Sequence, residues 1–151
     1  YDFSAEATRR SVERSLHLLQ TDHIDIVLVH SDGSGGETHA EALSALAALK
    51  QRGDICAFGI STRTVAGGLK AIPLVDLLMV AYSLDDTSQR EVLDAARQNA
   101  KGVLVKKALS SGHARDPGSA LCFSLAHPAV ASVIVGTINP HHLRANINAV
   151  G

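Results

Sequence analysis

The segment SLHLLQTDHIDIVLVH, residues 15–30, passes from a helical pattern to a strand pattern across a short polar break. Before the break, Val12, Leu16 and Leu19 recur at helical spacing and form one apolar stripe. Ser4 is a suitable N-cap for this helix. The pattern therefore predicts an amphipathic helix that ends at the break.

After the break, residues 24–29 are β-branched and apolar apart from Asp25. Such a run is typical of a short strand that is covered on both faces. His30 stands at the carboxyl end of this predicted strand. A histidine there is either an ordinary boundary residue or a functional group, and the segment alone does not decide between them.

The rest of the chain repeats the alternation. A polar loop follows at residues 31–37, and GSGG at 33–36 is interpreted as flexible because it lacks the G-x-G-x-x-G spacing of a dinucleotide-binding turn. Further strands are predicted at residues 55–60, 77–82, 103–109 and 130–135, and helices at 38–53, 65–72, 88–102, 116–127 and 139–150.

Four of these helices carry recognisable start signals. Residues 38–41 and 88–91 have capping-box spacing, in which a Ser or Thr is followed three positions later by Glu. Asp116-Pro117 and Asn139-Pro140 each place a capping side chain before a proline at the first helical position. Gly53 is expected to end the helix that begins near residue 38.

Strict alternation of strands and helices predicts an α/β fold with a parallel sheet. Two architectures fit five such units. They could form a complete open doubly wound sheet, or five of the eight strands of a (β/α)8 TIM barrel. The length of 151 residues fits a single domain, residues 1–151.

Composition excludes several classes of partner. The net charge of −1 gives no basic field for nucleic acid or an anionic membrane surface. No apolar run approaches the roughly 20 residues that span a bilayer, so a cytoplasmic location is expected. Cys56 and Cys122 are predicted to be buried free thiols. No metal site is expected, because the histidines and cysteines lack zinc spacing along the chain.

Four stretches resemble the aldo-keto reductases in the same order along the chain. They are SVERSLHLLQTDHIDIVLVHSDG (11–33), ALAALKQRGDICAFGIS (45–61), GVLVKKALSSGHA (102–114) and VIVGTINPHHLRAN (133–146). The resemblance implies a (β/α)8 barrel, of which this chain supplies about the last five βα units, strands four to eight. It also implies that His30 holds and polarises a substrate carbonyl. The family's donor tyrosine, lysine and aspartate are expected upstream of Tyr1, so the chain is expected to be a C-terminal portion.

The resemblance extends to a nicotinamide cofactor, with departures. Ser61 matches a serine that binds the carboxamide, but Thr62 stands where the family has asparagine. Met79 replaces a usual glutamine, and we favour its interpretation as a core residue over a role at the cofactor. Lys107 falls where an aromatic often stacks on the nicotinamide ring, and a solvated strand end is the alternative interpretation.

The residues expected at the phosphate end of the cofactor agree better with the family pattern. The resemblance assigns the pyrophosphate loop and the nucleotide end to Leu109, Ser110, Gly112, Gly136, Thr137, His142 and Asn146. Asn146 matches an asparagine used on the adenine. His142 falls where relatives often carry an arginine for the 2′-phosphate, and His141 and Arg144 are the other candidates for this contact. The implied function is an NADPH-dependent oxidoreductase, possibly also using NADH, that reduces an aldehyde or ketone. The alternative is a catalytically inactive barrel-like protein that binds a nucleotide or acts as a scaffold.

Overall fold

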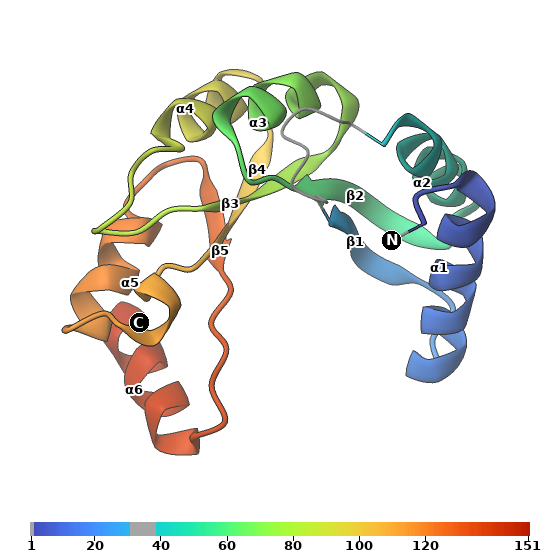
Figure 1. Cartoon of the computed structure of the whole chain (residues 1–151). Coiled ribbons are helices and arrows are strands. Elements are labelled where there is room, and N and C mark those ends of the chain that lie inside the picture. The colour runs from blue at the N-terminus through green and yellow to red at the C-terminus, as the bar shows by residue number, and fades with distance from the viewer. Residues whose placement is uncertain (1, 31–38) are drawn as a thin grey trace. The chain divides into compact units, whose positions relative to one another are not determined.

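The structure is a computed structural model, and it describes residues 2–30 and 39–151 (Figure 1). The loop predicted at residues 31–37, including GSGG, lies outside the described residues. In the described part, five strands alternate with helices and form one sheet in the order β1-β2-β3-β4-β5. The elements are α1 (Ala5–Leu19), β1 (Ile24–His30), α2 (Ala40–Arg52), β2 (Ile55–Ser61), α3 (Val65–Ala71), β3 (Leu77–Ala81), α4 (Arg90–Gln98), β4 (Gly102–Lys106), α5 (Pro117–Leu125), β5 (Val130–Val133) and α6 (Pro140–Val150), with short 3₁₀ turns at Ile72–Leu74 and Ser110–Gly112.

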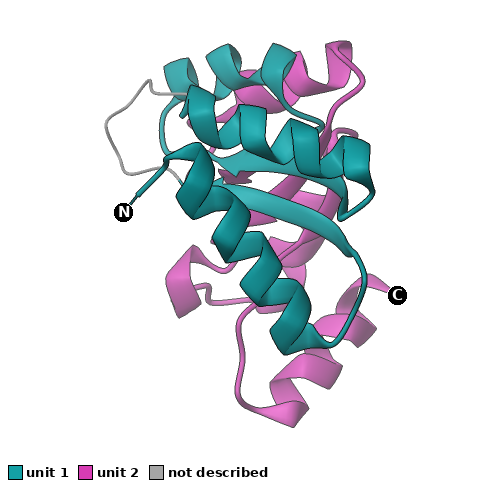
Figure 2. Cartoon of the chain, turned by 90° about the vertical axis from the view of Figure 1, so that its right-hand side faces the viewer, with its two compact units in different colours: residues 1–78 teal, residues 79–151 magenta. Residues whose placement is uncertain are grey.

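The chain separates into two compact units, Tyr1–Leu78 and Met79–Gly151 (Figure 2). The predicted α/β class is confirmed, and β1 pairs with β2, and β4 with β5, in parallel. The expectation of a single domain stays a prediction. Each unit has its own buried apolar residues, so each is described separately below.

The core of the first unit lies between α2 and the neighbouring strands. Leu46 and Leu49 of α2 and Ile55 of β2 are each at most 2% exposed. By contrast, β1 is not covered along its length, because Asp25 is exposed and Ile26 retains 43% of its surface. The prediction that both faces of this strand are covered is therefore wrong for the described chain.

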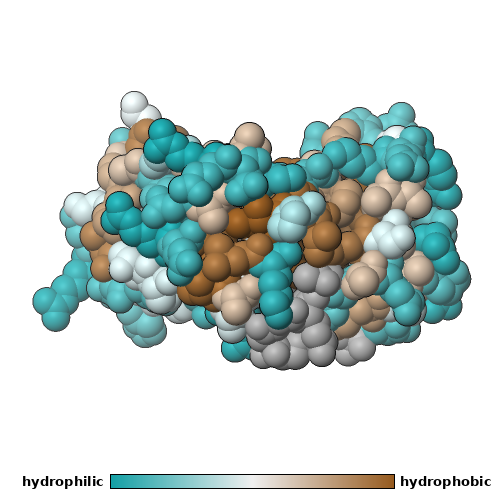
Figure 3. Space-filling view, turned by 90° about the horizontal axis from the view of Figure 1, so that it is seen from above, coloured by the Kyte–Doolittle hydropathy of each residue, from teal (hydrophilic) through white to brown (hydrophobic). Residues whose placement is uncertain are grey.

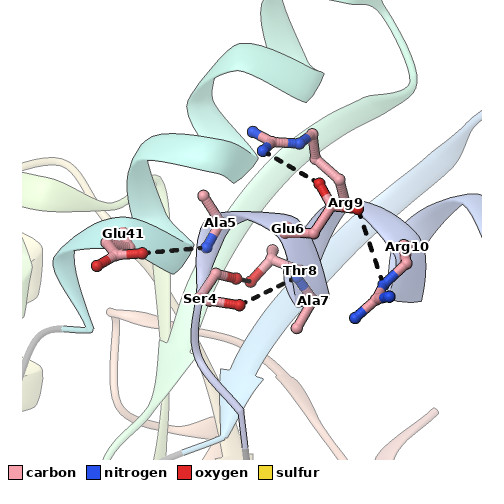
Figure 4. A network of polar contacts seen from close by, with 8 residues as sticks. All are labelled: Ser4, Ala5, Glu6, Ala7, Thr8, Arg9, Arg10 and Glu41. Carbon is pink, nitrogen blue, oxygen red and sulfur yellow. Dashed lines mark hydrogen bonds and ion pairs between the residues drawn. The ribbon is translucent and has the colours of Figure 1, made fainter.

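The start of α1 is fixed by local hydrogen bonds and by one contact from α2 (Figure 4). The Ser4 hydroxyl accepts a hydrogen bond from the backbone N–H of Ala7 at 3.2 Å, which confirms the predicted N-cap. The Thr8 hydroxyl donates to the Ser4 carbonyl at 2.9 Å. A carboxylate oxygen of Glu41 accepts from the N–H of Ala5 at 3.4 Å, and so links the first turns of the two helices.

Of the two predicted capping boxes, the first stays a prediction and the second is absent. Thr38 lies outside the described residues, and α2 begins after His39, whose side chain makes no cap hydrogen bond. The second prediction is wrong, because α4 begins after Gln89 while the backbone N–H of Ser88 donates to Asp86 at 3.0 Å. Here a turn around an aspartate competes with the box for the same polar groups.

The two Asx-Pro starts are confirmed in the second unit. The Asp116 carboxylate accepts from the N–H of Ser119 at 3.2 Å, and the Asn139 side chain accepts from the N–H of His141 at 2.9 Å. Hydrogen bonds from the side chain and then the backbone of Ser119 lower the pKa of Asp116 below its ordinary value. Both helices therefore begin where the sequence predicts.

The core of the second unit consists of alternate strand residues and the inner side of α4. Val80, Val92, Leu93, Val103 and Val105 have no exposed surface. The predicted strand 103–109 is shorter in the structure, where β4 ends at Lys106. It ends there because the next residue adopts a left-handed backbone with φ +61°.

One surface property departs from the expectations drawn from the sequence. Both cysteines, Cys56 and Cys122, are exposed rather than buried, so that prediction is wrong. Apolar atoms reach the surface on the face shown in Figure 3, within hydrophilic surroundings. No helix of the described chain is long and apolar enough to cross a membrane.

Gly59 of β2 provides a test of the first unit. A Cβ atom built there would lie 2.3 Å from the Leu77 carbonyl oxygen and 2.9 Å from Leu28 Cδ2. We expect Gly59→Ala to lower the free energy of unfolding by about 3 kcal/mol, because backbone must move to admit the methyl group. Chemical denaturation would measure this.

Gly102→Ala is the matched control, since its Cβ would meet nothing nearer than 4.0 Å in another strand. Equal stability of the two variants would contradict the close approach at Gly59.

Candidate functional site

The carboxyl ends of β1 and β2 bring His30 and Ser61 side by side. The two residues are direct partners in the parallel register of these strands. Ser61 is 4% exposed and Thr62, the next residue, 3% exposed, whereas His30 is exposed. In parallel α/β proteins, this edge of the sheet is where loops and strand ends form functional sites. The predicted carbonyl-orienting and carboxamide-binding positions are thus adjacent.

His30 also borders a hollow of about 200 Å³ in the first unit. The hollow lies among the N-terminal segment, α1, β1 and α2, and Phe3, Val12 and Leu46 contribute to its lining. An imidazole has one nitrogen that donates and one that accepts when the ring is neutral. His30 can therefore hydrogen-bond a carbonyl oxygen at this edge.

A larger cavity of about 410 Å³ lies in the second unit. It is formed by the turn after β4, the start of α5, the segment after β5 and one side of α6. The cavity gathers six of the residues that the sequence assigns to the cofactor, namely Leu109, Gly112, Gly136, Thr137, His142 and Asn146. Residues from three separate stretches of sequence therefore meet at one place.

The N-terminus of α6 contributes directly to this cavity. The Thr137 hydroxyl accepts from the N–H of Asn139 at 3.2 Å, and Asn139 in turn caps His141. Leu143 donates its N–H to the Asn139 carbonyl in the first helical bond. Among the described residues, no acceptor is present for the backbone N–H of His142. Together with the positive end of the helix dipole, this N–H suits an anion.

Two backbone donors of the turn after β4 already have partners within the turn. The N–H groups of Ser110 and Gly112 donate to the carbonyls of Lys107 and Leu109, at 2.9 and 2.8 Å. These two donors are therefore engaged within the turn. The Ser110 hydroxyl donates to the Asp85 carboxylate, so its side chain is directed to the β3–α4 loop.

Lys107 lies beside this turn and is exposed. It borders two smaller hollows, of about 270 Å³ with Gly136 and about 140 Å³ with Asp86. Hydrogen bonds from the Ser88 hydroxyl and N–H lower the pKa of Asp86, and the charge of Lys107 adds a weaker effect in the same direction. The positive charge of Lys107 thus partly offsets the negative charge of Asp86 beside the smaller hollow that both residues border.

The predicted cofactor residues and the lining of the large cavity do not coincide completely. Met79 lies in β3, is partly exposed and does not line the large cavity. The lining also includes Pro117, Gly118 and Ala149, which the sequence did not indicate. The small residues at 118 and 149 face each other across the α5–α6 contact, where a Cβ on Gly118 would lie 3.3 Å from that of Ala149.

Comparison with known proteins assigns the chain to a family. The sequence model of the Aldo/keto reductase family matches residues 1–119, and the chain belongs to this family. A solved structure from Pseudomonas aeruginosa that is assigned to the aldo-keto reductases is 48% identical, with a TM-score of 0.91 over 99% of this chain and 60% of that one. The five strands therefore correspond to part of a (β/α)8 barrel, and the doubly wound alternative is wrong.

Other relatives are more distant. L-galactose dehydrogenase from Arabidopsis thaliana is 27% identical over 99% of this chain and 60% of its own length. D-threo-aldose 1-dehydrogenase from a Pseudomonas species is 30% identical over 74% of this chain and 36% of its own length. The holo form of an aldo-keto reductase from Bacillus halodurans, 24% identical with a TM-score of 0.89, has the same fold. The chain thus spans about 60% of the length of the first of these relatives.

Gly136 offers a test of the large cavity. A Cβ at this residue would meet nothing within 4 Å, so the first atom of a side chain can be added without a clash. We expect Gly136→Leu to reduce the affinity of the complete protein for NADPH by at least about 10-fold, because the side chain would occupy space in the cavity. Fluorescence titration would measure the dissociation constant.

Gly102→Ala serves again as the control, since Gly102 does not line this cavity. Unchanged NADPH affinity in a folded Gly136→Leu variant would show that the nucleotide binds elsewhere.

Proposed function

We propose that the complete protein containing this chain is an NADPH-dependent oxidoreductase that reduces an aldehyde or ketone to an alcohol. The observation that carries the proposal is the gathering of six expected cofactor residues around one cavity of about 410 Å³ in the second unit. A small-molecule carbonyl substrate, a cytoplasmic location and secondary use of NADH are parts of the same proposal.

The residues present fit a dinucleotide. The cavity lining is mostly apolar, with Thr137, His142 and Asn146 as polar groups and the start of α6 as an anion site. The bound nicotinamide would supply the hydride. For this chain's own residues, we assign Asn146 to the adenine, Gly136 and the first turn of α6 to the phosphates, and Ser61 with Thr62 to the carboxamide. Leu109, Ser110 and Gly112 would border the pyrophosphate.

His30 would act on the substrate rather than on the nucleotide. Reduction of a carbonyl requires a proton at the oxygen while hydride reaches the carbon, so the developing negative charge on oxygen needs a nearby donor. His30 can donate one hydrogen bond there. In the proposal, the main proton donor is a tyrosine in the part of the complete protein outside this chain.

A protein of this fold without turnover is the second candidate. Three departures from the family pattern favour this candidate. Thr62 stands in place of asparagine, Met79 in place of glutamine, and Lys107 in place of an aromatic residue. Such a protein would bind the nucleotide as a sensor or serve as a scaffold. Carbonyl reduction by the complete protein would exclude this candidate.

The proposed role of His30 is tested by His30→Ala in the complete protein. We expect turnover of a simple aldehyde with NADPH to fall by about 10²-fold or more, the scale of a positioned hydrogen-bonding group. NADPH affinity and the unfolding midpoint should be retained, because the side chain is exposed.

His17→Ala removes another exposed histidine, in the last turn of α1, and should leave turnover unchanged. Full activity of His30→Ala would make His30 an ordinary strand-end residue.

Cofactor choice is tested at α6. His142 lines the cavity, whereas Arg144, two residues later, does not. If the imidazole contacts the 2′-phosphate, His142→Gln should weaken NADPH binding about 10-fold, the scale of a charge-assisted hydrogen bond, with little effect on NADH. Arg144→Gln should change neither affinity. A loss of NADPH preference in the arginine variant alone would transfer the role to Arg144.

A further inference from the structure

The amino-terminal ends of β1 and β2 bring together three side chains of the kinds that bind transition metals. A ring nitrogen of His23, a carboxylate oxygen of Asp25 and the Sγ atom of Cys56 all lie within 4.8 Å of one another. The absence of a metal site was predicted from spacing along the sequence, and strand pairing assembles this cluster from two separate stretches.

The β1–β2 register explains the cluster. Ile24 is the partner of Ile55, and Ile26 is the partner of Ala57, so Asp25 and Cys56 occupy the intervening positions on neighbouring strands. Adjacent side chains in this position project from the same face of the sheet. His23 immediately precedes β1 and reaches the same place from the α1–β1 connection.

The histidine is already oriented by a neighbouring carboxylate. Its Nδ1 atom lies 2.7 Å from Asp22 Oδ1. A carboxylate only accepts, so Nδ1 carries the proton and the lone pair of a neutral ring is on Nε2. Metal-binding histidines commonly make this second hydrogen bond, which fixes the ring for coordination.

The other two side chains are available as ligands. All three members of the cluster are exposed, and among the described residues the side chains of Asp25 and Cys56 make no hydrogen bond or ion pair. The set combines one thiolate, one carboxylate and one imidazole. Zn²⁺ binds each of these ligand types, and the two negative charges balance the ion.

We propose that His23, Asp25 and Cys56 bind one Zn²⁺ ion, with Asp22 positioning the histidine and water in the fourth position. Ligand atoms of a tetrahedral zinc site are roughly 3.5 Å apart, so modest side-chain rotations would close the present cluster. The Cys56 thiol loses its proton to solvent when the sulfur–metal bond forms.

The location separates this ion from the proposed site of carbonyl reduction. His30 stands at the other end of β1, five residues from Asp25, or roughly 16 Å along a strand. The ion would join the starts of β1 and β2 and would not contact the substrate. It should therefore raise the thermal unfolding midpoint while leaving carbonyl reduction unaffected.

The direct test uses the complete protein without an affinity tag, stripped of metal and titrated with Zn²⁺ by calorimetry. We expect one ion per chain, with affinity at least about 100-fold weaker in Cys56→Ser and in Asp25→Asn. Asp22→Asn should weaken binding about 10-fold, because it removes the oriented hydrogen bond but no ligand. Cys122→Ser, at the other exposed cysteine, should bind as the wild type does.

Two further measurements do not depend on calorimetry. Co²⁺ should give thiolate-to-metal charge-transfer absorption in the wild type and in Cys122→Ser, but not in Cys56→Ser. Zn²⁺ should slow alkylation of Cys56, read by mass spectrometry, and leave that of Cys122 unchanged. Absence of stoichiometric binding, or equal binding by Cys56→Ser, would overturn the proposal.

Discussion

The parallel pairing of β1 with β2 is the constraint on which the rest of the first unit depends. Gly59 of β2 carries no side chain at the point where Leu28 of β1 and the Leu77 carbonyl of β3 both approach closely. The resulting register places His30 beside Ser61 at one end and Asp25 beside Cys56 at the other. One backbone arrangement therefore determines which groups can cooperate at both edges of this strand pair.

Local patterns predicted most elements because their causes are local. The stripe Val12, Leu16 and Leu19 and the caps at Asp116 and Asn139 involve residues within a few positions of one another, and the corresponding helices form. The failures involve competing or distant partners. Asp86 accepts the hydrogen bond from the Ser88 N–H, which a capping box would direct to Glu91. The exposure of Cys56 depends on what covers its strand rather than on its apolar neighbours in the sequence.

The candidate site could be anticipated only through resemblance, since no single stretch contains it. Gly112, Gly136 and Asn146 are far apart in the sequence, yet they line one cavity. The resemblance could not show which hydrogen-bond partners the individual polar groups have within the fold. The Ser110 hydroxyl bonds to Asp85 and its N–H is used within the turn, which leaves the first turn of α6 as the better anion site. The His23–Asp25–Cys56 cluster was missed because its members are neighbours only after the strands pair.

The order of the strands has a consequence for how the chain is made. β1 pairs with β2, and β4 with β5, so each of these strands joins the next one to be synthesised. Pairing strands that follow one another closes shorter loops than pairing distant strands, and so costs less loop-closure entropy. Each βα unit can therefore dock on its predecessor as it leaves the ribosome, and assembly can proceed in the direction of translation without waiting for the carboxyl terminus.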